Sequence, residues 1–414
     1  MRPLHRLAAA LVIAALPSGL ATAAAQVATL DKADLANRFL LQISYQQESG
    51  HQDFRTSRSR IVRLRQDGSV LRMIDISDSR ADAERRVLAT IPIRSETCST
   101  LDVDLNEGFD TVSLEEDRTG EDYYGRIDRH DATRFSLHER RPLSVSNHDG
   151  TLVFDQEAVA SDGERIIVHY YLTPYHPPPE FQPFEMKNLR RFGFYETYPQ
   201  WRSGHWVLYA MKFDAHEPIV FALSSAIPAR HRAAMRDGAL YWNRAFGKPL
   251  VQVIDAPPGI HAPSPDYNVI QWVTSGEFAS TSYIQSDPST GRILHAHIFV
   301  LPEMMTDGDL QQQNDHLRYI VAHEVGHALG LRHNFAPGMP TTVMGYFELP
   351  QILRIGRAIR SGAPALPYDR AVVRHVYLGA PVDLDTLPPF CTDSQRGCLP
   401  FRSMPKETEG MRGR

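Results

Sequence analysis

The fold is decided by residues 316–346, which read HLRYIVAHEVGHALGLRHNFAPGMPTTVMGY. Between Leu317 and Leu329 there is no proline, and the apolar residues recur at helical spacing, which predicts an α-helix. Within it His323 and His327 are four residues apart, so their side chains project from nearly the same face, about one turn apart. Two imidazoles at this spacing can hold one metal ion.

His333 can join this pair only if the helix ends before it. A continued helix would carry His333 about 9 Å beyond His327, whereas zinc–nitrogen bonds are roughly 2.0 to 2.1 Å long. Gly330 lies between them, and glycine adopts the left-handed conformation of a helix end at little steric cost. The sequence therefore predicts that the chain turns back at Gly330 and brings three histidines around one Zn²⁺ ion.

Glu324 is predicted to be the general base of this site. It is turned by about 100° from His323, so its carboxylate can reach a metal-bound water rather than the metal. Three neutral imidazoles leave zinc a fourth position for that water, whose pKa falls to about 7. Glu324 would take the water's proton and pass it to the leaving amine of a peptide bond. The alternative, a buried helix with three incidental histidines, requires five fixed identities to coincide by chance.

The spacing H-E-x-x-H-x-x-G-x-x-H followed by Met344 resembles the metzincins, in which a Met-turn lies beneath the zinc ligands. Met344 could alternatively be an ordinary core methionine. Tyr346 repeats the M-x-Y pattern of the astacins and serralysins, and the resemblance makes it a candidate oxyanion donor, with a structural tyrosine as the alternative. HEVGHALGLRHNF and VMGY, with EPIVFALSSAIP, ALYWNRAF, DPSTGRIL and PYDRAV, are similar to bacterial secreted zinc-dependent metalloproteases. The similarity covers about 190–380, and Gly345 departs from it, since that group more often has Asp there.

Residues 1–25 predict a signal peptide: two arginines, an apolar run over Leu7–Leu16, and a small-residue end with cleavage after Ala25. The protein is then exported, either to the periplasm or out of the cell. No later segment reaches about 18 unbroken apolar residues, so no membrane span is expected. A formal net charge of −5 argues against nucleic acid as the partner. The expected partner is a protein or peptide substrate, and the oligomeric state stays open.

Residues 26–176 are predicted to form a mostly antiparallel β domain, because short alternating runs are separated by turn sequences such as Asp-Gly and Asn-Glu-Gly. It could be a propeptide, an inhibitory cover, a substrate-binding module or a folding aid. Four arginines interleave with apolar residues and predict a solvated strand face, with ligand binding as the alternative: Arg58, Arg60, Arg63 and Arg65. A Pro-rich linker and connecting segment follows over 177–204.

Residues 205–380 carry further predicted strands, PIVFALS, VQVIDA, NVIQWV and RILHAHIFVLP, and a long helix over 228–246. The fold class is therefore α+β. By resemblance, this part is a metzincin-like domain, with a twisted mixed sheet, long helices and the zinc helix. Two more helices are expected over 350–360 and 369–378. The first is basic, which indicates a solvated face or a border of the cleft that favours acidic substrates.

Two other groups of residues could bind metal or form a crosslink. His295 and His297 alternate on a predicted strand and share a face, as a second metal site or as walls of the cleft. Cys391 and Cys398, in the Pro-rich tail over 381–414, predict a disulfide in an exported protein. Cys98 is left over, either as a zinc ligand that keeps the enzyme latent or as a small buried hydrophobe.

Two other functions fit the same residues. One is an envelope binding or scaffold protein with a vestigial zinc site, against which the intact Glu324 counts. The other is a zinc amidase acting on cell-wall peptide. The motif defines the attacking water, while loops and pocket shape select the substrate.

Overall fold

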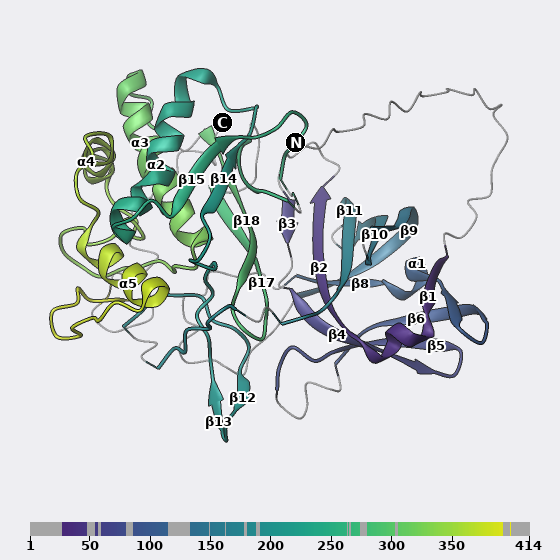
Figure 1. Ribbon diagram of the computed structural model, residues 1–414. Helices are drawn as coiled ribbons and strands as arrows, with labels where there is room; N and C mark the ends of the chain where they lie inside the picture. Colours follow the sequence, from purple (N-terminus) through teal and green to yellow (C-terminus); the bar gives the residue numbers. More distant parts are fainter. Residues whose placement is uncertain are drawn as a thin grey trace, which may run out of the picture.

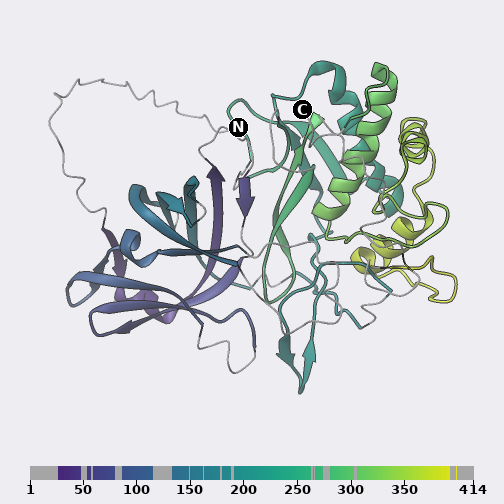
Figure 2. The same cartoon turned by 180° about the vertical axis from the view of Figure 1, so that it is seen from behind.

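The structure is a computed structural model of the 414-residue chain. It describes residues 27–47, 54–56, 59–79, 86–114, 133–148, 150–161, 163–177, 180–187, 191–262, 264, 266–273, 280–302, 305–391 and 398. The predicted signal peptide and Arg58 lie outside these residues. Two large hydrophobic cores are present, one built from residues between 28 and 172 and the other from residues between 186 and 390. They belong to the two units seen side by side in Figures 1 and 2.

The N-terminal unit is one curled antiparallel sheet, 11-stranded in the described residues (Figure 1). Its order is β1-β7-β6-β5-β4-β2-β11-β10-β9-β8, with β3 paired to β2. The strands are β1 (Ala28–Asp31), β2 (Arg38–Gln47), β3 (Phe54–Thr56), β4 (Arg60–Asp67), β5 (Val70–Asp75), β6 (Val87–Glu96), β7 (Thr100–Val103), β8 (Thr111–Leu114), β9 (Thr133–His148), β10 (Thr151–Ala160) and β11 (Arg165–Pro174). Two short helical turns accompany them, η1 (Lys32–Ala36) and α1 (Leu105–Gly108). Inward residues alternate with outward ones, as the sequence predicts for a sheet with one buried face.

The C-terminal unit contains a mixed sheet in the order β15-β14-β16-β18-β17, in which only β17 is antiparallel to its neighbour. Its helices α2 and α3 pack against each other, and α3 also contacts β17 and β18 (Figure 1). A small hairpin, β12-β13, projects from this unit (Figure 2). The elements are β12 (Gln200–Arg202), β13 (His205–Val207), β14 (Ile219–Leu223), α2 (Ala229–Phe246), β15 (Val251–Asp255), β16 (Asn268–Trp272), β17 (Thr281–Ser286), β18 (Ile293–Val300), α3 (Leu310–Ala328), α4 (Leu349–Arg360) and α5 (Pro367–Leu378). The chain is thus a mixed α/β protein.

Helix α3 begins seven residues before the predicted start at Leu317. Its first two turns, LQQQND, lack an apolar stripe and so gave no helical signal. The start is set by a capping box, in which the Asp309 side chain accepts from the backbone N–H of Gln312 and the Gln312 side chain accepts from that of Asp309. The cap extends α3 into a polar segment.

The two units meet along β17, and β3 lies next to it. Nε2 of Gln42 on β2 donates to Oε1 of Gln285 at 3.1 Å. The hydroxyl of Tyr175, just after β11, lies 3.0 Å from Oδ2 of Asp287. Gln200 of the hairpin donates from Nε2 to the carbonyl of Ser77 at 2.7 Å. Polar side chains therefore make the junction between the units.

The structure also bears on four further expectations from the sequence. Cys391 and Cys398 form the predicted disulfide. Cys98 is free and exposed, which contradicts a small buried hydrophobe. Arg60 is not on a solvated face, because it is buried against Asp75 at 2.5 Å. Of the described helices, none has the length and apolarity that a membrane span requires.

Candidate metal centre

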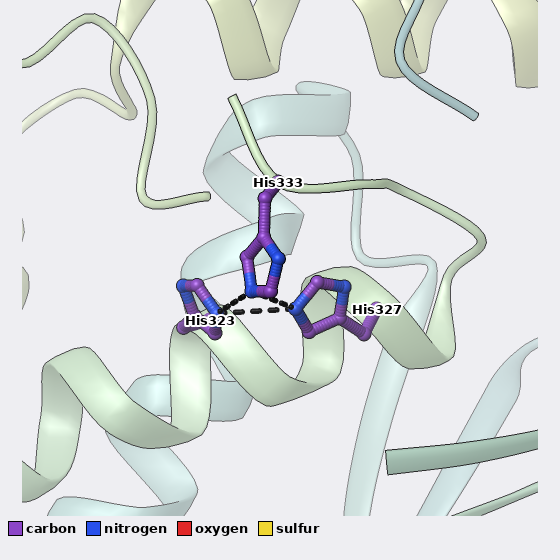
Figure 3. Close-up of side chains that lie close together, drawn as sticks. All are labelled: His323, His327 and His333. Carbon is purple, nitrogen blue, oxygen red and sulfur yellow. Dashed lines mark hydrogen bonds between the residues drawn. The ribbon is translucent and has the colours of Figure 1, made fainter. Parts of the chain in front are cut away.

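Three imidazoles converge beside the last turns of α3 (Figure 3). His323 and His327 come from successive turns of the helix, and His333 comes from the segment that follows it. The Nε2 atoms of the three rings are 3.0 to 3.1 Å apart. This is the predicted set of three histidines, and all three residues are buried.

The geometry fits a zinc ion. Tetrahedral zinc–nitrogen bonds of 2.0 to 2.1 Å would place the ligand nitrogens about 3.3 Å apart, close to the separations observed. Burial lowers the pKa of His323 to about 3 and that of His327 well below its usual value. Metal ligands must be neutral imidazoles, so a buried group of this kind is ready to bind.

Backbone carbonyls fix the orientation of two rings. Nδ1 of His323 donates to the carbonyl of Val343 at 2.8 Å, and Nδ1 of His327 donates to that of Leu331 at 2.8 Å. Because each Nδ1 carries the proton, each Nε2 presents its lone pair to the centre.

Gly330 makes the return of the chain possible, as predicted. Its φ is +94°, and a Cβ there would overlap the carbonyl oxygen of Met211. The next residue, Leu331, forms a β-bridge with Phe194. The turn that delivers His333 is therefore held between the helix and an earlier strand-like segment.

Met344 lies against α3 at Gly326. A Cβ on Gly326 would overlap Sδ of Met344 and the ring of Trp242, so only glycine allows this close approach. The carbonyl of Met344 accepts from the N–H of Asn334 at 2.8 Å. The segment around Met344 thus contacts both the helix and the chain next to His333.

Asp369 on α5 ties this segment down and was not singled out from the sequence. Its buried carboxylate accepts from the Thr342 hydroxyl, from the N–H of Val343 at 3.0 Å and from the Tyr241 hydroxyl at 2.6 Å. Val343 is the residue whose carbonyl orients His323. Asp369 therefore acts on the metal group through one intervening residue.

Glu324 is buried beside the histidines. Its Oε2 has no hydrogen-bond partner among the described residues, and burial raises the pKa of Glu324 to about 8. A bound cation acts in the opposite direction, because its charge favours the carboxylate. The structure therefore leaves one carboxylate oxygen available to a group outside the chain.

Two tyrosines adjoin the imidazoles. The ring of Tyr346 is 38% exposed and its centroid lies 4.6 Å from that of His333 and 5.6 Å from that of His323. The hydroxyl of Tyr195 is 3.4 Å from Nδ1 of His327. Tyr195 is 132 residues away in sequence, and no local pattern pointed to it.

His295 and His297 are not brought to the imidazole group. Their neighbours Ala296 and Ile298 belong to the core shared with α3, so the two histidines point to the opposite face of the sheet. In the described part of the chain, only the group of His323 has three possible metal ligands together. Among the described residues, His295 and His297 therefore have no third ligand beside them, and Cys98 does not belong to the group of His323.

Comparison with known proteins agrees with this geometry. A family model described as Met-zincin matches residues 306–343, which include α3 and the three histidines. The match supports a metzincin-like family. No curated protein and no solved structure matches the chain. Because the metzincin-like match implies zinc and three imidazoles are positioned to bind it, zinc is the cofactor of this site.

Proposed function

We propose that the protein is an exported zinc endopeptidase that hydrolyses peptide bonds in protein or peptide substrates. The observation that carries this proposal is the convergence of three Nε2 atoms within 3.0 to 3.1 Å, with the buried Glu324 on the same helix. Export rests on the signal sequence over 1–25.

His323, His327 and His333 hold the metal through Nε2. Zinc bound there supplies Lewis acidity, which polarises a carbonyl and lowers the pKa of water to about 7. Glu324 provides the proton acceptor: its unpartnered Oε2 takes a proton from the attacking water and returns it to the leaving nitrogen. Burial keeps that carboxylate away from competing donors.

Two further residues have supporting roles in the proposal. The ring of Tyr346 adjoins His323 and His333 and is partly exposed, which suits a hydroxyl that donates to the developing oxyanion. Met344 packs against Gly326 and supports the helix turn between the two ligands.

The test is cleavage of an unfolded protein by the zinc-loaded chain and by Glu324→Gln, with the zinc content measured in both. We expect equal zinc and a rate about 10² to 10⁴-fold lower for the variant, the usual contribution of a general base. Glu217→Gln, an exposed carboxylate before β14, serves as the matched control and should cut like the wild type.

Three results would contradict the proposal. If both loaded proteins cut equally, Glu324 is not the base. If the loaded wild type cuts no protein but releases cell-wall peptide, the site is an amidase. If it cuts neither while holding zinc, the chain is a binding protein with an inactive site.

A further inference from the structure

The outer face of the N-terminal sheet carries four arginines in one row, which we call the arginine row: Arg38, Arg63, Arg65 and Arg72. Arg38 on β2 stands directly opposite Arg63 on β4. Arg65 stands directly opposite Arg72 on β5. Since cross-strand partners and alternate residues share a face, all four side chains project from the same side, opposite the core.

Arginines that stand directly opposite each other repel, although Arg63 and Arg72 each have an interaction within the chain. Like charges directly opposite each other destabilise a sheet. Arg72 is compensated by an ion pair with Asp67 at 2.9 Å. In contrast, neither Arg38 nor Arg65 has an ion pair or side-chain hydrogen bond with any residue of the described chain. Both are exposed.

Three of these arginines line a cleft of about 1020 Å³ between the two units. These are Arg38, Arg63 and Arg65, and the hairpin of the other unit adds Arg202. Of the described residues around the cleft, only Asp78 is acidic. The chain as a whole has a net charge of −5, so the positive charge here is a local feature.

The neutral groups in the lining are less open to a ligand, because the Gln200 amide and the Tyr175 hydroxyl already hold the junction between the units. The Thr290 hydroxyl also lies in the lining and can hydrogen-bond to a peptide backbone. A volume near 1020 Å³ is at the upper limit of small-molecule pockets, so a chain segment fits it better than one small anion.

The cleft is close to the metal group. Tyr195 contacts His327, and Gln200, five residues later, lines the cleft. Five extended residues span at most about 18 Å, so the two sites are separated by no more than a short peptide.

We propose that the cleft binds an extended acidic segment of the protein substrate, a few residues from the bond that is cut. Arg63 and Arg65 are two residues apart on one strand, a spacing of about 6.6 Å. An extended peptide with acidic residues at alternate positions has the same repeat, and its carboxylates pair with guanidinium groups at short distance. This inference deepens the proposed peptidase function. It rests on that function only in taking the bound segment to be part of a substrate.

The first experiment measures binding alone. A fluorescein-labelled peptide of alternating Ser and Glu is titrated with the zinc-loaded Glu324→Gln chain and followed by fluorescence anisotropy. Peptides with Gln or Lys in place of Glu are the controls. We expect the Glu peptide to bind at least tenfold more tightly than the Gln peptide, with an affinity that falls as salt rises. Because cleavage is not measured, this result does not depend on whether the chain is a peptidase.

Variants locate the site. In the same background Arg63→Gln with Arg65→Gln should weaken binding of the Glu peptide at least tenfold. The matched control is Arg354→Gln with Arg357→Gln, two exposed arginines on α4, which should leave affinity within twofold. Should the first pair fail to fold, Arg65→Gln alone removes an exposed side chain that has no ion pair within the described residues, and it should weaken binding at least threefold.

Several outcomes would overturn the proposal. Equal binding of Glu and Gln peptides would remove the charge argument. Unchanged affinity in the folded Arg65→Gln variant would place binding elsewhere, and a loss in the α4 variant would assign it to α4. Two results would show that the cleft binds phosphate groups instead. In the first, inorganic polyphosphate binds more tightly than the peptide and displaces it. In the second, vesicles with anionic lipids bind through the arginine row and the peptide does not.

Discussion

The three histidines of the metal centre and the arginine row both bring side chains of one kind together, but the first group is buried and the second lies at the surface. The imidazoles are buried, and backbone carbonyls turn two of them so that their lone pairs meet. The arginines are directly opposite one another at the surface, and Arg38 and Arg65 have no counter-charge in the described chain. The chain itself fixes the geometry of the first group, whereas we propose that the second binds an acidic partner. Changes at the first should therefore alter stability and metal binding, and changes near the second should alter recognition.

The largest effect is expected for His333→Ala. Without the third imidazole the site keeps two protein ligands, and we expect loss of tight zinc binding and of cleavage, at least 10³-fold in rate. His316→Ala on the same helix is the control: His316 is also buried, and its Nδ1 accepts from the N–H of Thr306 at 3.1 Å. It should lose stability yet bind one zinc per chain. Equal zinc loss in both variants would show that the helix, and not the ligand set, had been disrupted.

The next effect concerns the buried carboxyl that holds the Met344 segment. Burial raises the pKa of Asp369 to about 6, above its ordinary value of 3.8. The folded state therefore binds this proton more tightly, so the contribution to stability is complete below pH 3.8 and is lost as pH rises through 6. From pH 4 to 7.5 we expect the free energy of unfolding of the wild type to fall by up to about 3 kcal/mol relative to that of Asp369→Asn. The measurement is urea unfolding of both proteins in the presence of a chelator.

Comparing the free energies of unfolding of the wild type and Asp369→Asn cancels the pH dependence of the other groups, including the buried histidines. A difference that stays flat would mean that the pKa of Asp369 is not shifted by folding, and one that grows in favour of the wild type as pH rises would mean that the three donors outweigh burial and lower it. Either result would contradict the expectation. The arginine row gives no such dependence over this range, since guanidinium groups stay charged.

The contrast also explains how far the sequence could be interpreted. His323, Glu324 and His327 lie on one helix, and a single glycine allows His333 to return, so local spacing was sufficient to predict the group. The helices over 228–246 and 350–360 and the disulfide at Cys391 also followed from local signals. Each of these depends on residues within about 20 positions of one another.

What the sequence did not reveal depends on long-range pairing. Asp369 and Tyr195 reach the metal group from segments that no periodicity connects to it. The arginines were interpreted as one solvated face, but Arg60 lies on the other side of β4 from Arg63 and is buried. Only the register of β2 against β4 shows that Arg38 joins Arg63. Such a pairing is set by the sheet as a whole.

The smallest effect is expected where the two units meet. The Tyr175 hydroxyl contacts the Asp287 carboxylate at 3.0 Å and the Ser289 hydroxyl at 2.6 Å, and burial raises the pKa of Tyr175 to about 12. Tyr175→Phe removes these bonds, while Asp287 keeps the N–H of Ser289 at 2.8 Å. We expect the contact between the units to lose about 1 kcal/mol of stability. This loss should appear as faster amide exchange in β17, with the zinc content unchanged. Tyr171→Phe, an outward tyrosine on β11, is the control. If Tyr175→Phe instead released the metal, the two units would be coupled as strongly as the buried network around zinc, and the distinction between the two regions would fail.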